Sequence, residues 1–282
     1  MGFLNSLVDF IQFDFLLYGL IASIMLSFIC SMLSPLVVAK NLAFYSSALS
    51  HSTFFSLGLG YFVLTDPNNH QLFFFVLVLS LFLGQLLSWG SYHQKLPSDS
   101  LVGLYFTGAM GIGILLIEKN PSASQKLTTY LFGNLLLVEP FQVTILFLLA
   151  IVVFMFIKVF ERELLLWCWN PDIARISLKN TFFIHSFLFL LITATLVLGL
   201  QIAGIIPMSS LIIVPGMFSS LFAKNRSQHF YYSLLFSIFT TLMGTFLSNY
   251  FNFSLGPAIA SFQVIIFLLF LPMLKYRVPR SI

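Results

Sequence analysis

The sequence predicts an all-α membrane protein, a polytopic bundle of about nine (eight or nine) transmembrane helices that forms a single domain over residues 1–282. Hydrophobic residues make up 59% of the chain and charged residues only 8%, whereas ordinary globular proteins carry about 25% charged residues. Apolar runs long enough to cross the hydrocarbon layer, about 20 residues each, occupy most of the chain. The predicted spans are 15–39, 43–64, 71–92, 101–117, 141–159, 181–200, 205–223, 230–250 and 256–274.

The positive charges predict the orientation of the bundle. If the N-terminus starts outside, eleven of the thirteen Lys and Arg residues fall on one side of the membrane, and Lys119 and Lys126 fall on the other. Basic residues gather on the cytoplasmic side of membrane proteins. The sequence therefore predicts the N-terminus outside and the C-terminus inside. This topology, rather than a nucleic-acid partner, accounts for the net charge of +4.

Three segments outside the spans have predicted roles. Residues 1–14 place apolar side chains at helical spacing, which predicts a segment lying against lipid in the membrane interface. Residues 158–180 form a cytoplasmic loop of mixed charge that is either a solvated turn or a docking element for a soluble subunit. Residues 118–140, on the outer side, form either a rim for a partner or a lid over the bundle.

The second span, 43–64, carries a candidate polar site inside the membrane. His51 lies about halfway through the hydrocarbon layer, a depth at which transporters place substrate sites. An ionisable side chain there costs roughly 3 kcal/mol on insertion scales, so it usually faces a cavity or a partner. His51 is therefore either a ligand in a pathway or an imidazole that hydrogen-bonds a neighbouring helix. Ser47 lies one helical turn before it.

Two predicted spans carry small residues at every fourth position, a pattern that lets membrane helices approach to backbone distance. In the second span these residues are Ala48, Ser52, Ser56 and Gly60. In the fourth span they are Gly103, Thr107 and Gly111. We expect the fourth helix to pack deep in the bundle for this reason.

The seventh span, 205–223, is expected to form a second wall of a pathway. Its candidate lining residues are Pro207, Ser209, Ser210 and Pro215. A proline inside a helix frees a backbone carbonyl, and such interrupted helices are tolerated in membranes where they are buried in protein or line a cavity.

Several chemistries are not indicated by this sequence. It has no GxxxxGK[ST] phosphate loop, no HExxH and no CxxC, so neither P-loop nucleotide hydrolysis nor a zinc-hydrolase site is expected. No Asp or Glu lies near the centre of a predicted span, which removes the usual proton relay of a coupled carrier. We therefore expect a chain that is not an enzyme, binds no cofactor tightly, and depends on another polypeptide for any pumping.

Six motifs, in order along the chain, carry a resemblance to a known family. They are KNLAFYSSALSHS (40–52), similar to the family's RRMALIGDALSHA; SDSLVGLYFTGAMGIGILL (98–116), to EDTAIGILFSSALALGVLL; LTTYLFGN (127–134), to LLSYLFGD; WNPDIAR (169–175), to FDPEFAR; LQIAGIIPMSSLIIVPG (200–216), to LKVVGVLLVSALLIIPA; and LGPAIA (255–260). The chain thus resembles, almost end to end, the permease subunit of the zinc-, manganese- and iron-type ABC importers (the ABC-3 metal permease family).

This resemblance implies a division of labour in a bacterial inner membrane. Two permeases would work with two cytoplasmic ABC ATPase subunits and with an extracytoplasmic binding protein that delivers a divalent metal ion. The second permease would be either a second copy, giving a homodimer, or a paralogue, giving a heterodimer. The WNPDIAR segment is implied to contact the ATPase. Its residues at the family's positions are Trp169, Asn170, Pro171, Asp172, Ala174 and Arg175, with Asn170 in place of an acid.

The resemblance also implies metal ligands at the Asp and His of the family's DALSH element. The histidine here is His51, and Ser47 stands at the Asp position. A neutral hydroxyl is a weaker ligand than a carboxylate for Zn²⁺ or Mn²⁺. Three explanations stay open: a paralogue supplies the acid, the transit site is weak, or the substrate is not a bare ion. Two other functions also stay open, an ATP-independent metal channel or carrier, and a membrane scaffold without transport.

Overall fold

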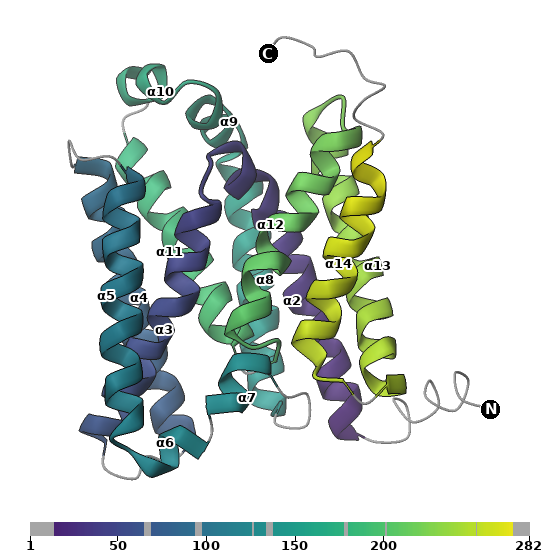
Figure 1. Ribbon diagram of the computed structural model, residues 1–282. Helices are drawn as coiled ribbons and strands as arrows, with labels where there is room; N and C mark the ends of the chain where they lie inside the picture. Colours follow the sequence, from purple (N-terminus) through teal and green to yellow (C-terminus); the bar gives the residue numbers. More distant parts are fainter. Residues whose placement is uncertain are drawn as a thin grey trace.

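Helices form the fold throughout the part of the chain that the computed structural model describes, which is residues 14–64, 69–93, 98–125, 127–133, 138–177, 180–200, 202–251 and 253–272. They are α2 (Asp14–Ala39), α3 (Ala43–Val63), α4 (Asn69–His93), α5 (Ser98–Glu118), α6 (Pro121–Gln125), α7 (Leu127–Phe132), α8 (Pro140–Val159), α9 (Glu161–Trp169), α10 (Pro171–Ser177), α11 (Thr181–Gly199), α12 (Ile205–Phe222), α13 (Arg226–Phe251) and α14 (Leu255–Phe270) (Figure 1). The predicted interfacial segment, residues 1–14, lies outside the described residues except for Asp14.

Each predicted span coincides with one long helix. These helices are α2, α3, α4, α5, α8, α11, α12, α13 and α14. By length and composition, α2, α4, α5, α8, α11 and α13 can cross a membrane, while α12 and α14 contain shorter apolar helices. The second span, α3, is richer in hydroxyl side chains. The prediction of an all-α polytopic membrane fold is confirmed by this arrangement.

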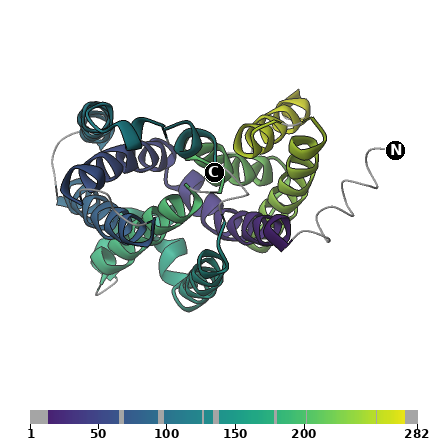
Figure 2. The same ribbon diagram turned by 90° about the horizontal axis from the view of Figure 1, so that it is seen from below.

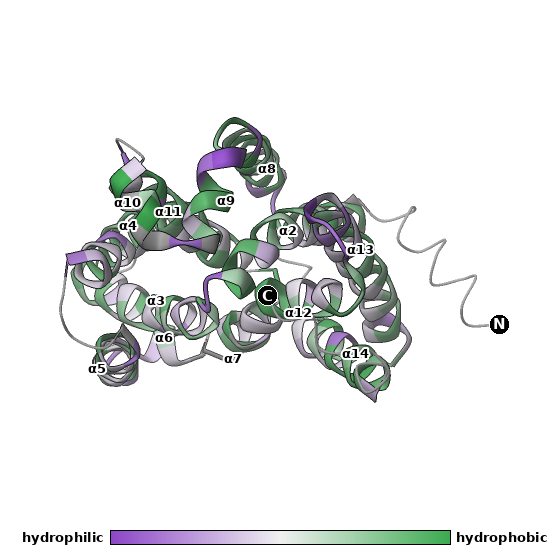
Figure 3. Ribbon diagram, turned by 90° about the horizontal axis from the view of Figure 1, so that it is seen from above, coloured by the Kyte–Doolittle hydropathy of each residue, from purple (hydrophilic) through white to green (hydrophobic). Residues whose placement is uncertain are grey.

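The long helices run side by side and leave the short helices at the two ends. Helices α9 and α10 lie across one end, and α6 and α7 lie at the other (Figure 1). Viewed from the α9–α10 end, α3, α4, α5 and α11 form a group on one side of α2 and α12, and α13 and α14 lie on the other side (Figure 3). The same division is visible from the opposite end (Figure 2). The central helix, α2, contacts α8, α12 and α13, and its Leu26, Ile29 and Leu33 are almost fully buried.

A proline in α2 explains why α13 packs against it. Pro35 has no N–H, so the carbonyl of Ser31, four residues earlier, loses its partner in the helix. The hydroxyl of Ser233 on α13 donates to that carbonyl at 2.9 Å. Toward the other end of the bundle, Ser237 donates to the Ser27 carbonyl at 3.1 Å. Hydroxyl groups of α13 therefore hold it against α2 where the proline interrupts the ladder.

The same part of α2 also brings α12 to backbone distance. The backbone N–H of Gly216, next to Pro215, donates to the Ser34 hydroxyl at 2.6 Å. A Cβ atom at Gly216 would lie 2.6 Å from the Ser34 carbonyl oxygen, so glycine is required for this approach. Helix α12 continues through Pro215 without a break, and Pro215 is buried in protein.

The small-residue stripe of α3 packs as predicted. Ala48, Ser52 and Ser56 are almost fully buried, and Ser80 of α4 donates to the Ser56 hydroxyl at 2.9 Å. A Cβ atom at Gly60 would lie 2.8 Å from a methyl carbon of Leu72 on α4. At Ser56 and Gly60 the stripe therefore forms a close seam against α4.

The expectation for the fourth span is wrong. Thr107 is exposed and its hydroxyl bonds the Gly103 carbonyl of its own helix at 2.9 Å. A Cβ atom at Gly111 would meet nothing within 4 Å. Helix α5 lies at the edge of the bundle and packs through another glycine, because a Cβ atom at Gly58 of α3 would lie 2.7 Å from the Gly113 carbonyl oxygen. Several glycines occur in this helix, and four-residue spacing alone selected the wrong face.

Candidate functional site

His51 lies on α3 where that helix faces α5. The imidazole is half-buried, with the Phe106 ring of α5 edge-on at 5.1 Å and Phe54 stacked at 6.4 Å between centroids. Its Nδ1 atom is buried and has no hydrogen-bond partner among the described residues. A buried polar atom without a partner is costly and calls for an explanation. The ring thus offers a nitrogen that no protein group in the described part of the chain uses.

Ser47 connects the two sets of candidate residues. Its hydroxyl donates to the Ser209 hydroxyl of α12 at 3.1 Å, so the candidate ligand helix meets the candidate pathway helix. Ser210 turns to its own helix and donates to the Pro207 carbonyl at 2.7 Å, and both Pro207 and Pro215 are buried. Of the four candidate lining residues, Ser209 is therefore the one that the structure places in contact with the α3 pair.

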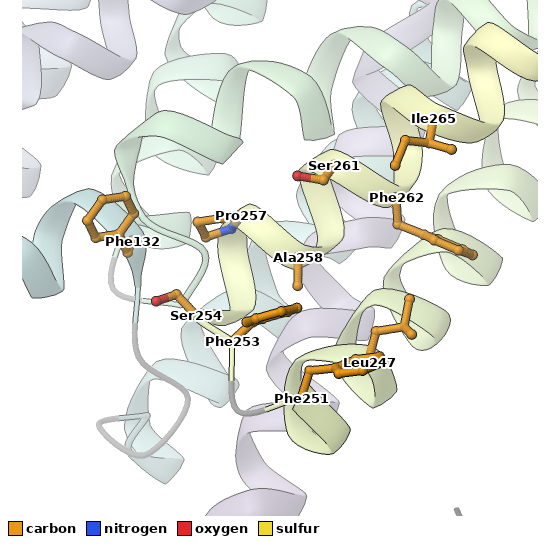
Figure 4. A pocket seen from close by; sticks show the side chains of 10 residues that line it. All are labelled: Phe132, Leu247, Phe251, Phe253, Ser254, Pro257, Ala258, Ser261, Phe262 and Ile265. Atoms are coloured by element: carbon orange, nitrogen blue, oxygen red, sulfur yellow. The ribbon is translucent and has the colours of Figure 1, made fainter.

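Two cavities in the described part of the bundle lie away from His51. The larger, about 430 Å³, opens between α7, α13 and α14 (Figure 4). Its lining includes four aromatic rings and two hydroxyls: Phe132, Phe251, Phe253, Phe262, Ser254 and Ser261. The smaller lies against α3, α4 and α11, and neither is lined by His51 or Ser47. Apolar walls with two hydroxyls do not suit a transition metal, which prefers nitrogen, sulfur or carboxylate ligands.

A metal cage of acidic, histidine and cysteine side chains is not formed within the described ranges. There, no three His, Cys, Asp or Glu side chains lie close enough together to hold an ion. Two further histidines lie on other helices. His185 of α11 is buried, and its Nδ1 lies 3.0 Å from the Ser88 hydroxyl of α4. His70 of α4 is exposed, and its Nε2 lies 3.7 Å from a carboxylate oxygen of Glu139.

Residues 158–180, predicted as a loop, contain two short helices instead. Glu161 and Glu163 occupy the first turn of α9, where acidic side chains favour a helix start. Asn170 separates α9 from α10, and its side-chain oxygen accepts from the Ile173 N–H at 3.1 Å. Asparagine caps a helix N-terminus about as well as aspartate. Asn170 therefore fits the position that precedes α10.

The WNPDIAR segment sits at the end of the bundle with one buried anchor. Ala174 is fully buried, and its carbonyl accepts from the Thr181 hydroxyl at the start of α11 at 3.1 Å. The side chains of the remaining predicted coupling residues lie outside the described set: Trp169, Pro171, Asp172 and Arg175. The backbone of the segment is thus fixed to α11, whatever those side chains contact.

Two exposed isoleucines on α10 were missed by the sequence analysis. Ile173 is 49% exposed and Ile176 is 88% exposed. They lie three residues apart, on neighbouring positions of one helix face. Isolated apolar residues on a surface are common, but a pair on a short helix beyond the long helices suits a partner surface. The signal was present in the sequence as two isoleucines in a charged segment.

Comparisons with known proteins agree on one family. Residues 12–273 match the ABC 3 transport family. The chain is 27% identical to a probable iron transport system membrane protein of Haemophilus influenzae, over 96% of this chain and 98% of that protein. It is 30% identical to the high-affinity zinc uptake system membrane protein ZnuB of Buchnera aphidicola, over 89% of this chain and 95% of that protein.

A solved structure shows the same fold. PsaBC from Streptococcus pneumoniae in complex with Fab superposes with a TM-score of 0.80 at 23% identity, over 94% of both chains. This chain therefore belongs to the ABC 3 transport family.

Proposed function

We propose that this chain is the membrane permease subunit of an ATP-driven ABC importer for divalent transition-metal ions: zinc, manganese or iron. It would pass the ion from an extracytoplasmic binding protein to the cytoplasm. Family membership supports this function, and relatives are named for iron and zinc transport. The absence of a phosphate-loop motif places ATP hydrolysis on a separate subunit. An ATP-independent channel or carrier has no support from the family.

The proposed topology has nine spans as one domain in a bacterial inner membrane, with the N-terminus outside. The described contacts of basic residues support it. Lys40 lies over the ring of Trp167 on α9, and Arg226 pairs with Glu161 at the start of α9. Both therefore lie at the α9–α10 end, whereas Lys119 follows α5 at the α6 end (Figure 1). The α9–α10 end would be the cytoplasmic one.

The transit site would include His51, and the unpartnered Nδ1 is the observation that carries this assignment. Neutral imidazole is a common ligand of zinc and related ions. Ser47, one turn away, would be a weak ligand or would hold α3 against α12 through Ser209. A passing ion needs a site that it can leave, so a weak ligand is compatible with transport.

Three partners complete the proposal. Helix α10, with Ile173 and Ile176 exposed, would dock on the cytoplasmic ATPase. An extracytoplasmic metal-binding protein would deliver the ion at the α6–α7 end. A second permease would face this one, and we favour a paralogue that supplies the carboxylate missing at Ser47. Isolation of a homodimer with unimpaired metal uptake would exclude the paralogue.

ATP-dependent uptake in vesicles tests the function. The permease is reconstituted with its ATPase and binding protein, and radioactive zinc, manganese and iron are offered separately. We expect uptake of at least one ion that requires ATP. His51→Ala should reduce that uptake by about tenfold or more, since one ligand nitrogen is lost, while His51→Cys, which keeps a metal ligand, should retain part of it.

The Ser47 variants give a matched series. Ser47→Asp restores the family's acid and should lower the metal concentration at half-maximal uptake, whereas Ser47→Thr, which keeps the hydroxyl, should leave it unchanged. Uptake that persists without ATP would contradict the importer. ATP-dependent uptake that is unchanged in His51→Ala would leave the importer standing and remove His51 from the site.

A further inference from the structure

Trp167 of α9 lies in a cluster that no predicted role explains. Its side chain is only 6% exposed. The Lys40 ammonium lies 3.9 Å from the centroid of its ring. The His185 ring of α11 lies edge-on to it at 5.5 Å between centroids. Trp167 is thus packed between the α2–α3 turn and α11.

From His185, ring contacts continue to α3. The His185 ring stacks on Phe189, one turn further along α11, at 4.6 Å. Phe189 in turn lies edge-on to Tyr45 of α3 at 5.3 Å. Tyr45 is buried and precedes Ser47 by two residues. A continuous line of packed rings therefore runs from α9 to the helix that carries the candidate ligands.

Lys40 gives α9 a second, shorter connection to α3. It belongs to the turn between α2 and α3, in which Asn41 has a left-handed backbone conformation with φ of 55°. Cys168 follows Trp167 in α9. Burial raises the pKa of its thiol to about 11, and the positive charge of Lys40 acts to lower it. The start of α3 is thus tied to α9 by the contact of Lys40 with Trp167.

The other end of α9 is also attached. Glu161 in its first turn pairs with Arg226 at the start of α13. Asn170 joins its last turn to α10 through a backbone bond to Ala174 at 3.0 Å and through the cap of Ile173. A displacement of α10 therefore moves α9, and the buried Trp167 carries that displacement into the packed rings, since close-packed interiors transmit strain rather than absorb it.

We propose that Trp167, held by Lys40 and His185, is the positioning residue that couples the α10 surface to α3. A movement of α10 would shift Trp167 and, through Lys40 and Tyr45, would tilt the part of α3 that carries Ser47 and His51. This inference rests on the proposed function, because it assigns a route by which the ATPase would act on the transit site. Trp167 touches neither the ion nor the nucleotide.

The ratio of metal transported to ATP hydrolysed measures this coupling. The full complex is reconstituted in vesicles with zinc as the probe, and uptake and ATP hydrolysis are followed in the same sample. Trp167→Ala should lower the ratio by about tenfold, within the range by which coupling residues act, with ATP hydrolysis continuing. Trp167→Phe should recover part of it. The control is Trp89→Ala, because Trp89 is 55% exposed on α4, and it should keep the wild-type ratio.

Lys40 supplies a second test that leaves the core intact. Lys40→Arg retains a cation over the ring and should keep the ratio. Lys40→Met retains the apolar stem but removes the charge, and should lower the ratio a few-fold. If Trp167→Ala does not assemble, the Lys40 pair decides. In addition, the double variant Lys40→Met with Trp167→Phe should be less impaired than the product of the two single effects, because both remove the same contact.

The possible results distinguish a failure of the coupling role of Trp167 from a failure of the proposed importer function. A wild-type complex that shows no ATP-dependent uptake contradicts the proposed importer. The second outcome is a wild-type complex that couples ATP hydrolysis to uptake, together with unchanged ratios in the variants Trp167→Phe, Lys40→Met and any assembled Trp167→Ala. This outcome would overturn the coupling role of Trp167 and leave the importer standing. A merely structural role would lower the amount of assembled complex and leave the ratio unchanged.

Discussion

Two seams between long helices differ in whether their buried polar groups have hydrogen-bond partners. Between α2 and α13, two hydroxyls of α13 are paired across the seam: Ser27 and Ser237 lie 2.8 Å apart, and Ser233 donates to the carbonyl that Pro35 frees. The Thr241 hydroxyl oxygen, one turn further along α13, has no partner among the described residues. On α3, near α5, Ser50 and His51 each bury a polar atom that has no partner within the described residues. Both seams are closely packed, so the difference does not come from looser packing of α3.

Paired and unpaired polar groups suggest different roles in this bundle. A hydroxyl pair inside a membrane protein holds two helices together and needs no further role. A buried ring nitrogen without a partner costs stability, and a sequence tends to keep such a group where function requires it. The contacts of Ser233 and Ser237 with α2 therefore fit a scaffold, and His51 stays the candidate for the proposed substrate site, because its unpaired atom is a ligand nitrogen rather than a hydroxyl oxygen.

The largest loss of stability is expected at the seam between α3 and α5, where glycines bring the two backbones close together. A Cβ atom at Gly113 would lie 2.8 Å from the Phe54 carbonyl oxygen, on backbone that cannot move aside. Gly113→Ala should therefore lower the free energy of unfolding by about 3 kcal/mol, at the upper end for overpacking. Gly111→Ala on the same helix meets nothing within 4 Å and should be neutral. Thermal unfolding in detergent would measure both, and equal effects would mean that the seam is loose.

The sequence predicted the helices well because each is a long apolar run, and lipid leaves the chain few alternatives to a helix. It also placed Ser47 and His51 correctly one turn apart on α3. The error on α5 arose because that helix carries glycine on more than one face, so spacing could not select Gly113 over Gly111. Only the position of α3 decides between them.

Contacts between distant segments could not be predicted. Nothing local to Lys40 points to Trp167, and nothing local to Ser47 points to Ser209, since these pairs meet only when the bundle folds. The exposed face of α10 was likewise hidden, because a charged segment predicts solvent without saying which of its apolar residues stay uncovered. The sequence therefore named most candidate residues, and the fold supplied their partners.

The next largest loss of stability is expected at the seam between α2 and α13. Ser233→Ala leaves the Ser31 carbonyl without a donor, because Pro35 cannot supply one. An unsatisfied buried carbonyl costs about 1–3 kcal/mol, and we expect about 1.5 kcal/mol of lost stability. In a Pro35→Ala background the carbonyl regains a backbone donor, so Ser233→Ala should cost less there. A double-mutant cycle by unfolding would show this coupling, and strictly additive losses would contradict it.

His51→Leu should have opposite effects on the stability of the protein and on metal uptake. Removing an unpaired buried nitrogen should raise the free energy of unfolding by about 1 kcal/mol in metal-free protein, while ATP-dependent metal uptake is lost. If the imidazole instead served a neighbouring helix as a hydrogen-bond partner, the same change would lower stability. Thermal unfolding and vesicle uptake on one preparation distinguish the two readings of His51 that the sequence left open.

Ser50→Ala is the smallest change and the most direct test of the comparison. The Ser50 hydroxyl is buried without a described partner, so its loss should leave stability unchanged or raise it by less than about 1 kcal/mol. Ser52→Ala is the matched control on the same helix, because the Ser52 hydroxyl donates to the Leu49 carbonyl at 2.8 Å, and its loss should cost a few tenths of a kcal/mol. A greater loss for Ser50→Ala than for Ser52→Ala would mean that an ordered water or a partner chain satisfies Ser50 in the membrane. Ser50 on α3 would then be paired like Ser233 and Ser237 on α13, and the distinction between scaffold and substrate face would have to rest on His51 alone.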